Sequence, residues 1–174
     1  MSELCFDIDG EEIYLDKVLV DYEHVPLFFV CSGANGYYIS LCTDIEQLTY
    51  IVANVSRLDL YEMLQGHITM RDVILRQKYF YEIESADEVT SDIVTRKPIS
   101  EINYSMLPYE GAYFEAVTDE LRDYVEMKSF ELLVDIHFSL RKTVKVSWFE
   151  QHEYSQETEY YTASKIEGLE TLVA

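Results

Sequence analysis

The sequence predicts an α+β fold, mainly an antiparallel sheet of hairpins with two or three short helices. Short apolar runs alternate with turns that contain glycine, which is typical of β-hairpins. Two later runs begin with Ser or Thr placed three residues before Asp, which is a helix N-cap pattern. Of 174 residues, 48% are hydrophobic and 14% aromatic, so the chain can bury a core without disulfide bonds.

The first hairpin is expected near the start of the chain. Leu4–Ile8 and Glu12–Leu15 flank Asp9-Gly10, a dipeptide suited to a two-residue turn with positive φ. The segment Asp7-Ile8-Asp9-Gly10 lacks the third acid and the closing Glu of a calcium-binding loop. We therefore interpret it as a turn.

A second hairpin is expected around Gly33-Ala34-Asn35-Gly36, between strands at Leu27–Ser32 and Tyr37–Thr43. Both faces of this pair are largely apolar, which predicts a central place in the sheet. In either register that the loop allows, Cys31 lies across from Tyr38 or Ser40 and not from Cys42.

The three cysteines, Cys5, Cys31 and Cys42, are an odd number and have no CxxC spacing. This usage fits a reducing compartment better than a disulfide framework. The N-terminus has no basic segment followed by an apolar one, and no apolar run approaches membrane-spanning length. We therefore expect a soluble cytoplasmic protein.

The middle of the chain alternates between strand and capped helix. Leu48–Val55 reads as a strand, after which Ser56 with Asp59 predicts a helix that ends at Gly66. Thr69 with Asp72 repeats the cap for a second short helix, and Lys78–Ile83 returns to strand. These N-terminal elements form one α+β unit.

Glu84–Pro98 is polar, has no sustained period and ends in proline, so it is the best candidate for a linker. On this interpretation an acidic α+β unit covers residues 1–85. A second unit, a helix plus an antiparallel hairpin, covers residues 98–174. One undivided domain is the alternative.

The second unit is expected to begin with an amphipathic helix over Thr118–Met127. Apolar and polar residues then alternate over Phe130–Leu140, which predicts a half-buried strand. Residues 144–148 continue this parity, so we expect a hairpin with a bulged three-residue loop at 141–143. From Glu150 onwards the polar, tyrosine-rich chain predicts an edge strand or an exposed arm.

Charge is the strongest indication of the kind of partner. Asp and Glu number 33 against 13 Lys and Arg, for a net charge of −20. Such a chain repels free nucleic acid and anionic lipid and suits a basic protein surface. Spread evenly, the excess amounts to one charge per about 440 Å², whereas duplex DNA has one per about 110 Å². Imitation of DNA would need most of the excess gathered on about a quarter of the surface.

The acids are concentrated in residues 1–56, where Lys17 is the single base. Exposed tyrosines would add contact area at low entropic cost against an arginine-rich partner. The candidate partner-binding residues are Asp7, Asp9, Glu11, Glu12, Asp16, Asp21, Glu23, Tyr109, Tyr113, Tyr154, Tyr160 and Tyr161.

No reaction is indicated, and we expect no catalytic residue and no cofactor. A Gly-x-Ser-x-Gly elbow and a phosphate-binding glycine loop are both missing from the sequence. The nearest approach to a metal site is Asp135, His137 and Glu131, which would share one face of the expected strand. A solvent-facing polar row explains the same pattern.

Five segments together resemble an uncharacterised bacterial and phage domain family: Val20–Val30, Asn35–Tyr38, Tyr50–Ser56, Leu64–Asp72 and Leu107–Tyr113. The family pattern is an apolar strand, a glycine turn, a second strand, a serine-capped helix, a capped turn with Arg-Asp, and a Leu-Pro-x-x-Gly segment. The resemblance covers about residues 14–114 and implies an α+β fold. It brings no known reaction, so no catalytic residue is carried over.

The leading hypothesis is a non-enzymatic acidic interaction protein that inhibits a nucleic-acid-handling target by binding its basic surface. Anti-CRISPR, anti-restriction and immunity proteins of phages and mobile elements share this physical type, which is an analogy of composition. A metal-dependent hydrolase and a housekeeping module whose acidity serves solubility are the alternatives. The oligomeric state stays open.

Overall fold

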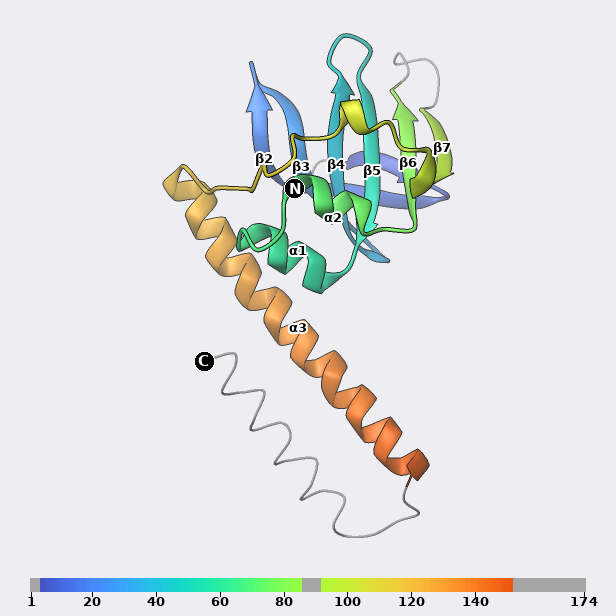
Figure 1. Cartoon of the computed structure of the whole chain (residues 1–174), viewed down its shortest axis with the longest axis vertical. Helices are drawn as coiled ribbons and strands as arrows, with labels where there is room; N and C mark the ends of the chain where they lie inside the picture. Colours follow the sequence, from blue (N-terminus) through green and yellow to red (C-terminus); the bar gives the residue numbers. More distant parts are fainter. Residues whose placement is uncertain (1–3, 86–91, 152–174) are drawn as a thin grey trace. The chain divides into compact units, whose positions relative to one another are not determined.

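The computed structural model describes residues 4–85 and 92–151, and it confirms an α+β fold dominated by an antiparallel sheet (Figure 1). In the described residues, seven strands pair antiparallel in the order of the sequence. The strands are β1 (Leu4–Ile8), β2 (Glu11–Tyr22), β3 (Val25–Gly33), β4 (Gly36–Asp44), β5 (Thr49–Val55), β6 (Tyr79–Glu84) and β7 (Ile93–Pro98). The helices are α1 (Arg57–Leu64), α2 (Met70–Leu75) and α3 (Asp119–Gln151), with 3-10 turns η1 (Ile99–Glu101) and η2 (Tyr104–Met106).

The chain divides into two compact units, Met1–Glu126 and Met127–Ala174. The boundary therefore falls inside α3, whereas the sequence suggested a division at 84–98. The first unit contains the whole sheet, α1, α2 and the first turns of α3.

The first hairpin forms as expected. Asp9 and Gly10 have φ of 55° and 83°, and Ile8 pairs with Glu11 across the turn. β2 then runs on to Tyr22, well beyond Leu15, where we expected it to end. Irregularities in the β2–β3 register break the strict alternation that would have revealed the extension.

A second unexpected feature is the turn between β2 and β3. Glu23 and His24 both have positive φ, 47° and 69°. Residues other than glycine rarely adopt this backbone conformation. The sequence has neither glycine nor asparagine at the turn to signal it.

The central hairpin adopts one of the two registers that the sequence allowed. Phe28 pairs with Leu41, and Cys31 lies opposite Tyr38. Both faces of β3 and β4 are largely buried, and Cys5, Cys31 and Cys42 form no disulfide with one another. The prediction of a central hairpin without a disulfide is confirmed.

The two short helices cover one face of the sheet, α1 against β4 and α2 against β5 (Figure 1). Their predicted caps are confirmed. The hydroxyl of Ser56 accepts a hydrogen bond from the Asp59 amide at 3.0 Å, and that of Thr69 accepts one from the Asp72 amide at 2.9 Å. Gly66, with φ of 70°, follows the end of α1.

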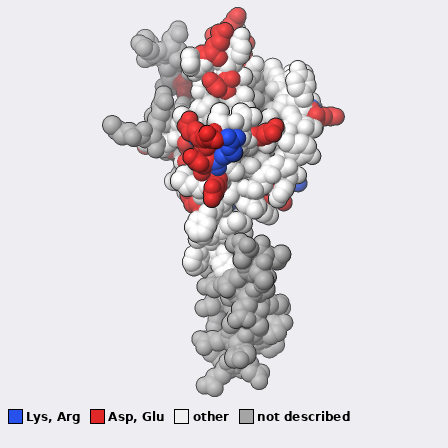
Figure 2. Space-filling model, turned by 90° about the vertical axis from the view of Figure 1, so that its left-hand side faces the viewer, with Lys and Arg blue, Asp and Glu red and all other residues white. Residues whose placement is uncertain are grey.

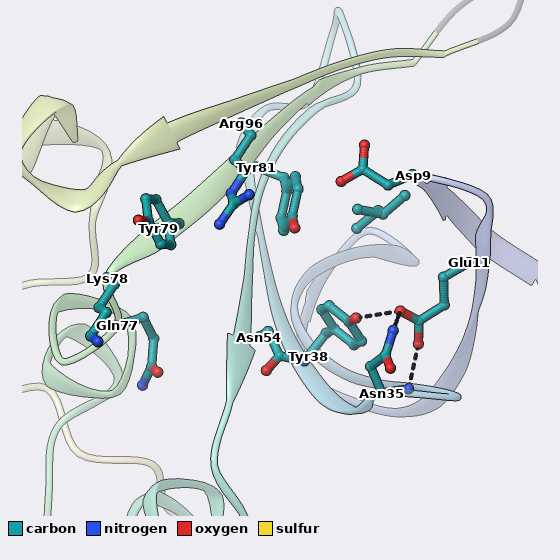
Figure 3. Close-up of a pocket in the computed structure, with 11 residues that line it drawn as sticks. Asp9, Glu11, Asn35, Tyr38, Asn54, Gln77, Lys78, Tyr79, Tyr81 and Arg96 are labelled. Atoms are coloured by element: carbon teal, nitrogen blue, oxygen red, sulfur yellow. Dashed lines mark hydrogen bonds between the residues drawn. The ribbon is translucent and has the colours of Figure 1, made fainter.

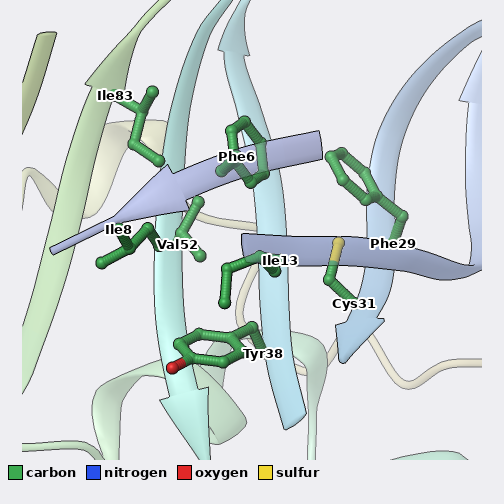
Figure 4. Packing of buried hydrophobic residues seen from close by; sticks show 8 residues of the cluster. All are labelled: Phe6, Ile8, Ile13, Phe29, Cys31, Tyr38, Val52 and Ile83. Carbon is green, nitrogen blue, oxygen red and sulfur yellow. The ribbon is translucent and has the colours of Figure 1, made fainter. Parts of the chain in front are cut away.

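The other face of the sheet forms its own core because the sheet curls. β1 and the start of β2 cross over the strands that follow them, as Figure 4 shows. Phe6, Ile8 and Ile13 thereby pack with Val52 and Ile83, all at most 5% exposed. Full burial of each such side chain contributes about 1.5–3 kcal/mol.

The expected linker is wrong over its second half. Ile93–Pro98 forms β7 at the edge of the sheet, with Val94 opposite Ile83 and Arg96 opposite Tyr81. No residue of this short strand is fully buried, and Val94 alone is packed against the inner core, so its sequence shows little apolar periodicity. Proline at its end is typical of an edge strand.

The predicted strand at Phe130–Leu140 and the hairpin after it are also wrong, because α3 is helical throughout Asp119–Gln151. The expected helix start at Thr118 is confirmed, since its hydroxyl accepts from the Leu121 amide at 3.2 Å. The third helix is therefore long rather than short. The arm expected beyond Glu150 falls almost entirely outside the described residues.

The error has a physical cause. A spacing of four residues, as in Phe130, Val134 and Phe138, satisfies both the strand period and one face of a helix. The segment contains neither glycine nor proline and is rich in Glu, Leu and Lys. No helix-breaking residue therefore occurs at 141–143, where the sequence analysis expects the loop.

Ile13→Ala should lower the free energy of unfolding by about 2–5 kcal/mol, because it removes a fully buried side chain from the inner core. Chemical denaturation measures the loss. Val20→Ala, at a 37% exposed position of the same strand, should cost about 0.5 kcal/mol or less. Equal losses at both positions would contradict the curl.

Val134→Pro should reduce the helical circular dichroism signal, because proline inside a helix costs about 3 kcal/mol relative to alanine. Val134→Ala is the matched control and should leave the signal unchanged. An unchanged spectrum for the proline variant would favour a strand at this position.

Candidate functional site

A polar cleft of about 520 Å³ lies at one end of the curled sheet (Figure 3). The β1–β2 turn, with Asp9 and Glu11, forms one wall. β6 and β7, with Tyr81 and Arg96, form the other wall. Asn54 of β5 lies between the walls. The cleft exists because the curl brings the first hairpin opposite the last one.

Glu11 is held in place by three hydrogen bonds. Its carboxylate accepts from the backbone amide of Asn35 at 2.7 Å, from the Asn35 side chain at 2.5 Å and from the Tyr38 hydroxyl at 2.8 Å. Partial desolvation raises the pKa of Glu11, but these bonds outweigh it and hold the pKa below its ordinary value. Glu11 therefore ties the first hairpin to the central one.

The pKa of Tyr38 is shifted in the opposite direction, above its ordinary value. Burial raises the pKa of its hydroxyl, and the hydrogen bond to Glu11 raises it further. Tyr38 pairs with Asn54 across β4 and β5. The hydroxyl therefore stays a proton donor, which stabilises this wall of the cleft.

Gly33 has no side chain and so leaves room for the Glu11 carboxylate in this hydrogen-bond network. A Cβ atom built on Gly33 would overlap the Glu11 carboxylate and the side chain of Ile13. Only glycine lets the end of β3 approach the start of β2 so closely.

The opposite wall combines aromatic rings with bases. Arg96 pairs with Tyr81 across the ladder, and its guanidinium lies 4.0 Å from the ring centre of Tyr79. Lys78 immediately precedes β6 and lines the same cleft. Figure 3 shows Arg96 directed between the two tyrosines. Such stacking orients a guanidinium while keeping its charge available.

The seven N-terminal carboxylates proposed for partner binding divide into two groups. Asp7, Asp9, Glu11 and Glu12 lie at or beside the β1–β2 turn, and the rest lie further along the chain. Asp16 follows Glu12 by four residues and Asp21 follows it by nine, which at about 3.3 Å per residue correspond to about 13 Å and about 30 Å of strand. Two acidic areas, at the β1–β2 turn and at the far end of β2, therefore replace the single array that imitation of DNA would favour.

Within the first group, Asp7 and Glu12 also have a structural role besides their charge, as Glu11 does. Asp7 accepts a hydrogen bond from the Gly10 amide at 2.9 Å inside the turn, and Glu12 accepts one from the Tyr14 hydroxyl at 2.6 Å. In the second group, Asp16 accepts from the Tyr124 hydroxyl at 2.6 Å. Asp16 thus anchors the first turns of α3 to β2.

The second group continues onto the start of α3, which the sequence had not connected with it. Lys17 forms an ion pair with Glu120, and Arg122 forms one with Asp119. We call the exposed acids around these two pairs the acidic face; its members are Asp21, Glu23, Asp119, Glu120 and Asp123. Figure 2 views the side of β2 and the α3 start, and shows carboxylates gathered around a small basic group.

The candidate tyrosines are located only in part. Tyr109 is 89% exposed and Tyr113 is 53% exposed, on the segment that leads into α3. Tyr154, Tyr160 and Tyr161 lie outside the described residues.

The suggested metal cluster required a strand at residues 130–140, and the structure has a helix there. Asp135 and His137 belong to α3, where residues two apart point to different sides. Glu131 forms an ion pair with Lys128 at 3.0 Å. Among the described residues, no three His, Cys, Asp or Glu side chains are grouped to hold a metal ion.

Comparisons with protein-family models, with curated proteins and with solved structures give no match. The resemblance over residues 14–114 therefore adds no functional residue. In the described part of the chain, every helix is too short or too polar to cross a membrane.

Glu11→Gln should destabilise the fold by about 1–2 kcal/mol at neutral pH, because it removes the charge from three hydrogen bonds. The folded pKa of Glu11 is depressed, so the stabilisation is present above its unfolded pKa. It is lost as the pH falls through the folded pKa.

Denaturation of wild type and variant at several pH values measures this difference, which should shrink towards acid. Asp9→Asn, in the exposed turn beside it, is the control and should stay close to wild type throughout. A difference that does not change with pH would contradict the role of the Glu11 charge.

Proposed function

We propose that the chain is a non-enzymatic interaction protein that binds a basic surface on a protein partner. A nucleic-acid-handling protein is the favoured target class, because such proteins carry the basic surfaces that an acidic binder recognises. Binding there would inhibit the target by occupying its nucleic-acid site, as inhibitors from phages and mobile elements do.

The acidic face supports this proposal most directly. Its five acids are exposed, and they come from two parts of the chain that Lys17 and Asp16 join. The nearby bases Lys17 and Arg122 are already paired, so they offset only part of the negative charge. An outward-facing excess of this kind accelerates encounter with a positive partner.

Exposed aromatic side chains supply the second component of an interface. Tyr109 and Tyr113 are exposed and lie ten and six residues before Asp119, the first residue of α3. Tyrosine rings bury area at low entropic cost and accept arginine over their faces. Acids would then set orientation and association rate, while tyrosines contribute contact area.

The division of the acids favours a protein surface contact over imitation of a duplex. A partner that reads a continuous phosphate pattern would have to span both acidic areas. A partner that presents a cluster of Lys and Arg needs only the acidic face.

The proposal is tested by affinity capture from the native host, followed by association kinetics with the captured partner. A variant with Asp21, Glu23, Asp119 and Asp123 changed to Lys should associate at least tenfold more slowly at low salt. Wild-type association should slow steeply as salt rises, because screening weakens the attraction.

The control variant carries the same number of reversals at exposed acids away from the acidic face: Asp9, Glu12, Glu46 and Glu84. Both variants have the same net charge, so only the location of the charge differs. Equal slowing in both would reduce the effect to net charge. Binding that is insensitive to salt and to both variants would refute the proposal and favour a role for the acids in solubility.

A further inference from the structure

We propose that the cleft between the β1–β2 turn and β6–β7 binds a small nucleotide of the nucleoside monophosphate class. The inference does not rest on the acidic face, since it concerns a different surface with a different charge balance. Three parts of the cleft correspond to the three parts of such a ligand.

The first part is a local excess of unpaired bases. Within the described residues, Lys17, Arg76 and Lys97 all form ion pairs with carboxylates. Lys78 and Arg96 form none there, although acids outnumber bases 33 to 13 in the chain. Both line the cleft, and both are exposed. Two such bases beside one hollow suit a phosphate group.

The net charge of the protein opposes the binding of an anion. At −20 the molecule as a whole repels phosphate. An anion that binds must therefore be held by local contacts, and Arg96 is already oriented for this by Tyr79 at 4.0 Å. A planar guanidinium fixed in this way can bind a phosphate through two parallel hydrogen bonds.

The second part is a set of planar and amide groups that suits a nucleobase. Tyr81 lies beside Arg96, and Tyr38 with Asn54 lines the facing side of the cleft (Figure 3). Aromatic rings stack on any base, at about 1–3 kcal/mol per base. The Asn54 amide can both donate and accept hydrogen bonds, as base edges require.

The third part is a carboxylate for sugar hydroxyls. Asp9 is exposed at the tip of the β1–β2 turn and lines the cleft opposite the bases. Carboxylates accept hydrogen bonds from ribose hydroxyls in nucleotide sites. Glu11 is less suited to this role because Asn35 and Tyr38 already bind it.

The size of the cleft agrees with a small ligand. Its volume of about 520 Å³ lies within the range of about 300–1,000 Å³ that is usual for small-molecule sites. Its four charged residues, Asp9, Glu11, Lys78 and Arg96, balance in charge. The cleft thus differs from the acidic surface around it.

The test uses the full chain and titrates it with AMP, GMP, CMP and UMP, measured by calorimetry and by shifts of amide resonances. Adenosine and inorganic phosphate are the two partial ligands. We expect at least one monophosphate to bind at least tenfold more tightly than either partial ligand, because only it contacts both walls. Resonances of the cleft residues should shift, and those of the acidic face should not.

Variants then locate the site. Lys78→Gln and Arg96→Gln should each weaken binding about tenfold, since each removes a charge-assisted contact. Lys97→Gln is the matched control, because Lys97 follows Arg96 directly but points to the other face and pairs with Glu82 at 3.0 Å. It should bind as the wild type does.

Several outcomes overturn the inference. One is the failure of all four monophosphates to produce a saturable signal at millimolar concentration. A second is binding of inorganic phosphate as tight as that of every monophosphate, which would leave the ring-binding part without support. A third is equal weakening by Lys97→Gln and Arg96→Gln, which would reveal a general charge effect. None of these results bears on capture of a basic partner by the acidic face.

Discussion

Packing of the first hairpin onto the inner face of its own sheet is the interaction on which the rest of the structure depends. Phe6, Ile8 and Ile13 close over Val52 and Ile83, and without them that face would be an open apolar surface. The same curl of the sheet places Asp9 and Glu11 opposite Tyr81 and Arg96. The cleft is therefore a direct consequence of the curl, and Glu11 and Gly33 hold its edge in position.

The two candidate binding regions, the acidic face and the cleft, differ in how their charges are arranged. On the acidic face, outward carboxylates outnumber the bases, and the few bases present are paired. In the cleft, charges of both signs face one another across tyrosine and amide side chains. The first arrangement acts at a distance and is weakened by salt, whereas the second acts by contact and geometry. One small sheet unit can support both because they use opposite ends of β2.

Sequence reasoning succeeded where a local rule decides the structure. The caps at Ser56 and Thr69, the Asp9-Gly10 turn and the Gly33–Gly36 turn all follow from neighbours within a few residues. It failed at α3, where a four-residue spacing fits strand and helix alike, and propensity decided against our choice. It also failed at β7, where no residue is fully buried and the apolar pattern is too weak to recognise.

The sequence by itself determined the fold class, the β1–β2 and β3–β4 hairpins, the capped helices and the acidic character of the chain. Each depends on backbone preference or on composition, which act locally or without regard to position. Only the tertiary structure decided where the acids lie, that Asp16 and Lys17 meet the start of α3, and that Lys78 and Arg96 face Asp9 across a cleft. These juxtapositions join residues far apart in the chain, and they follow from how the sheet curls to bury its apolar face.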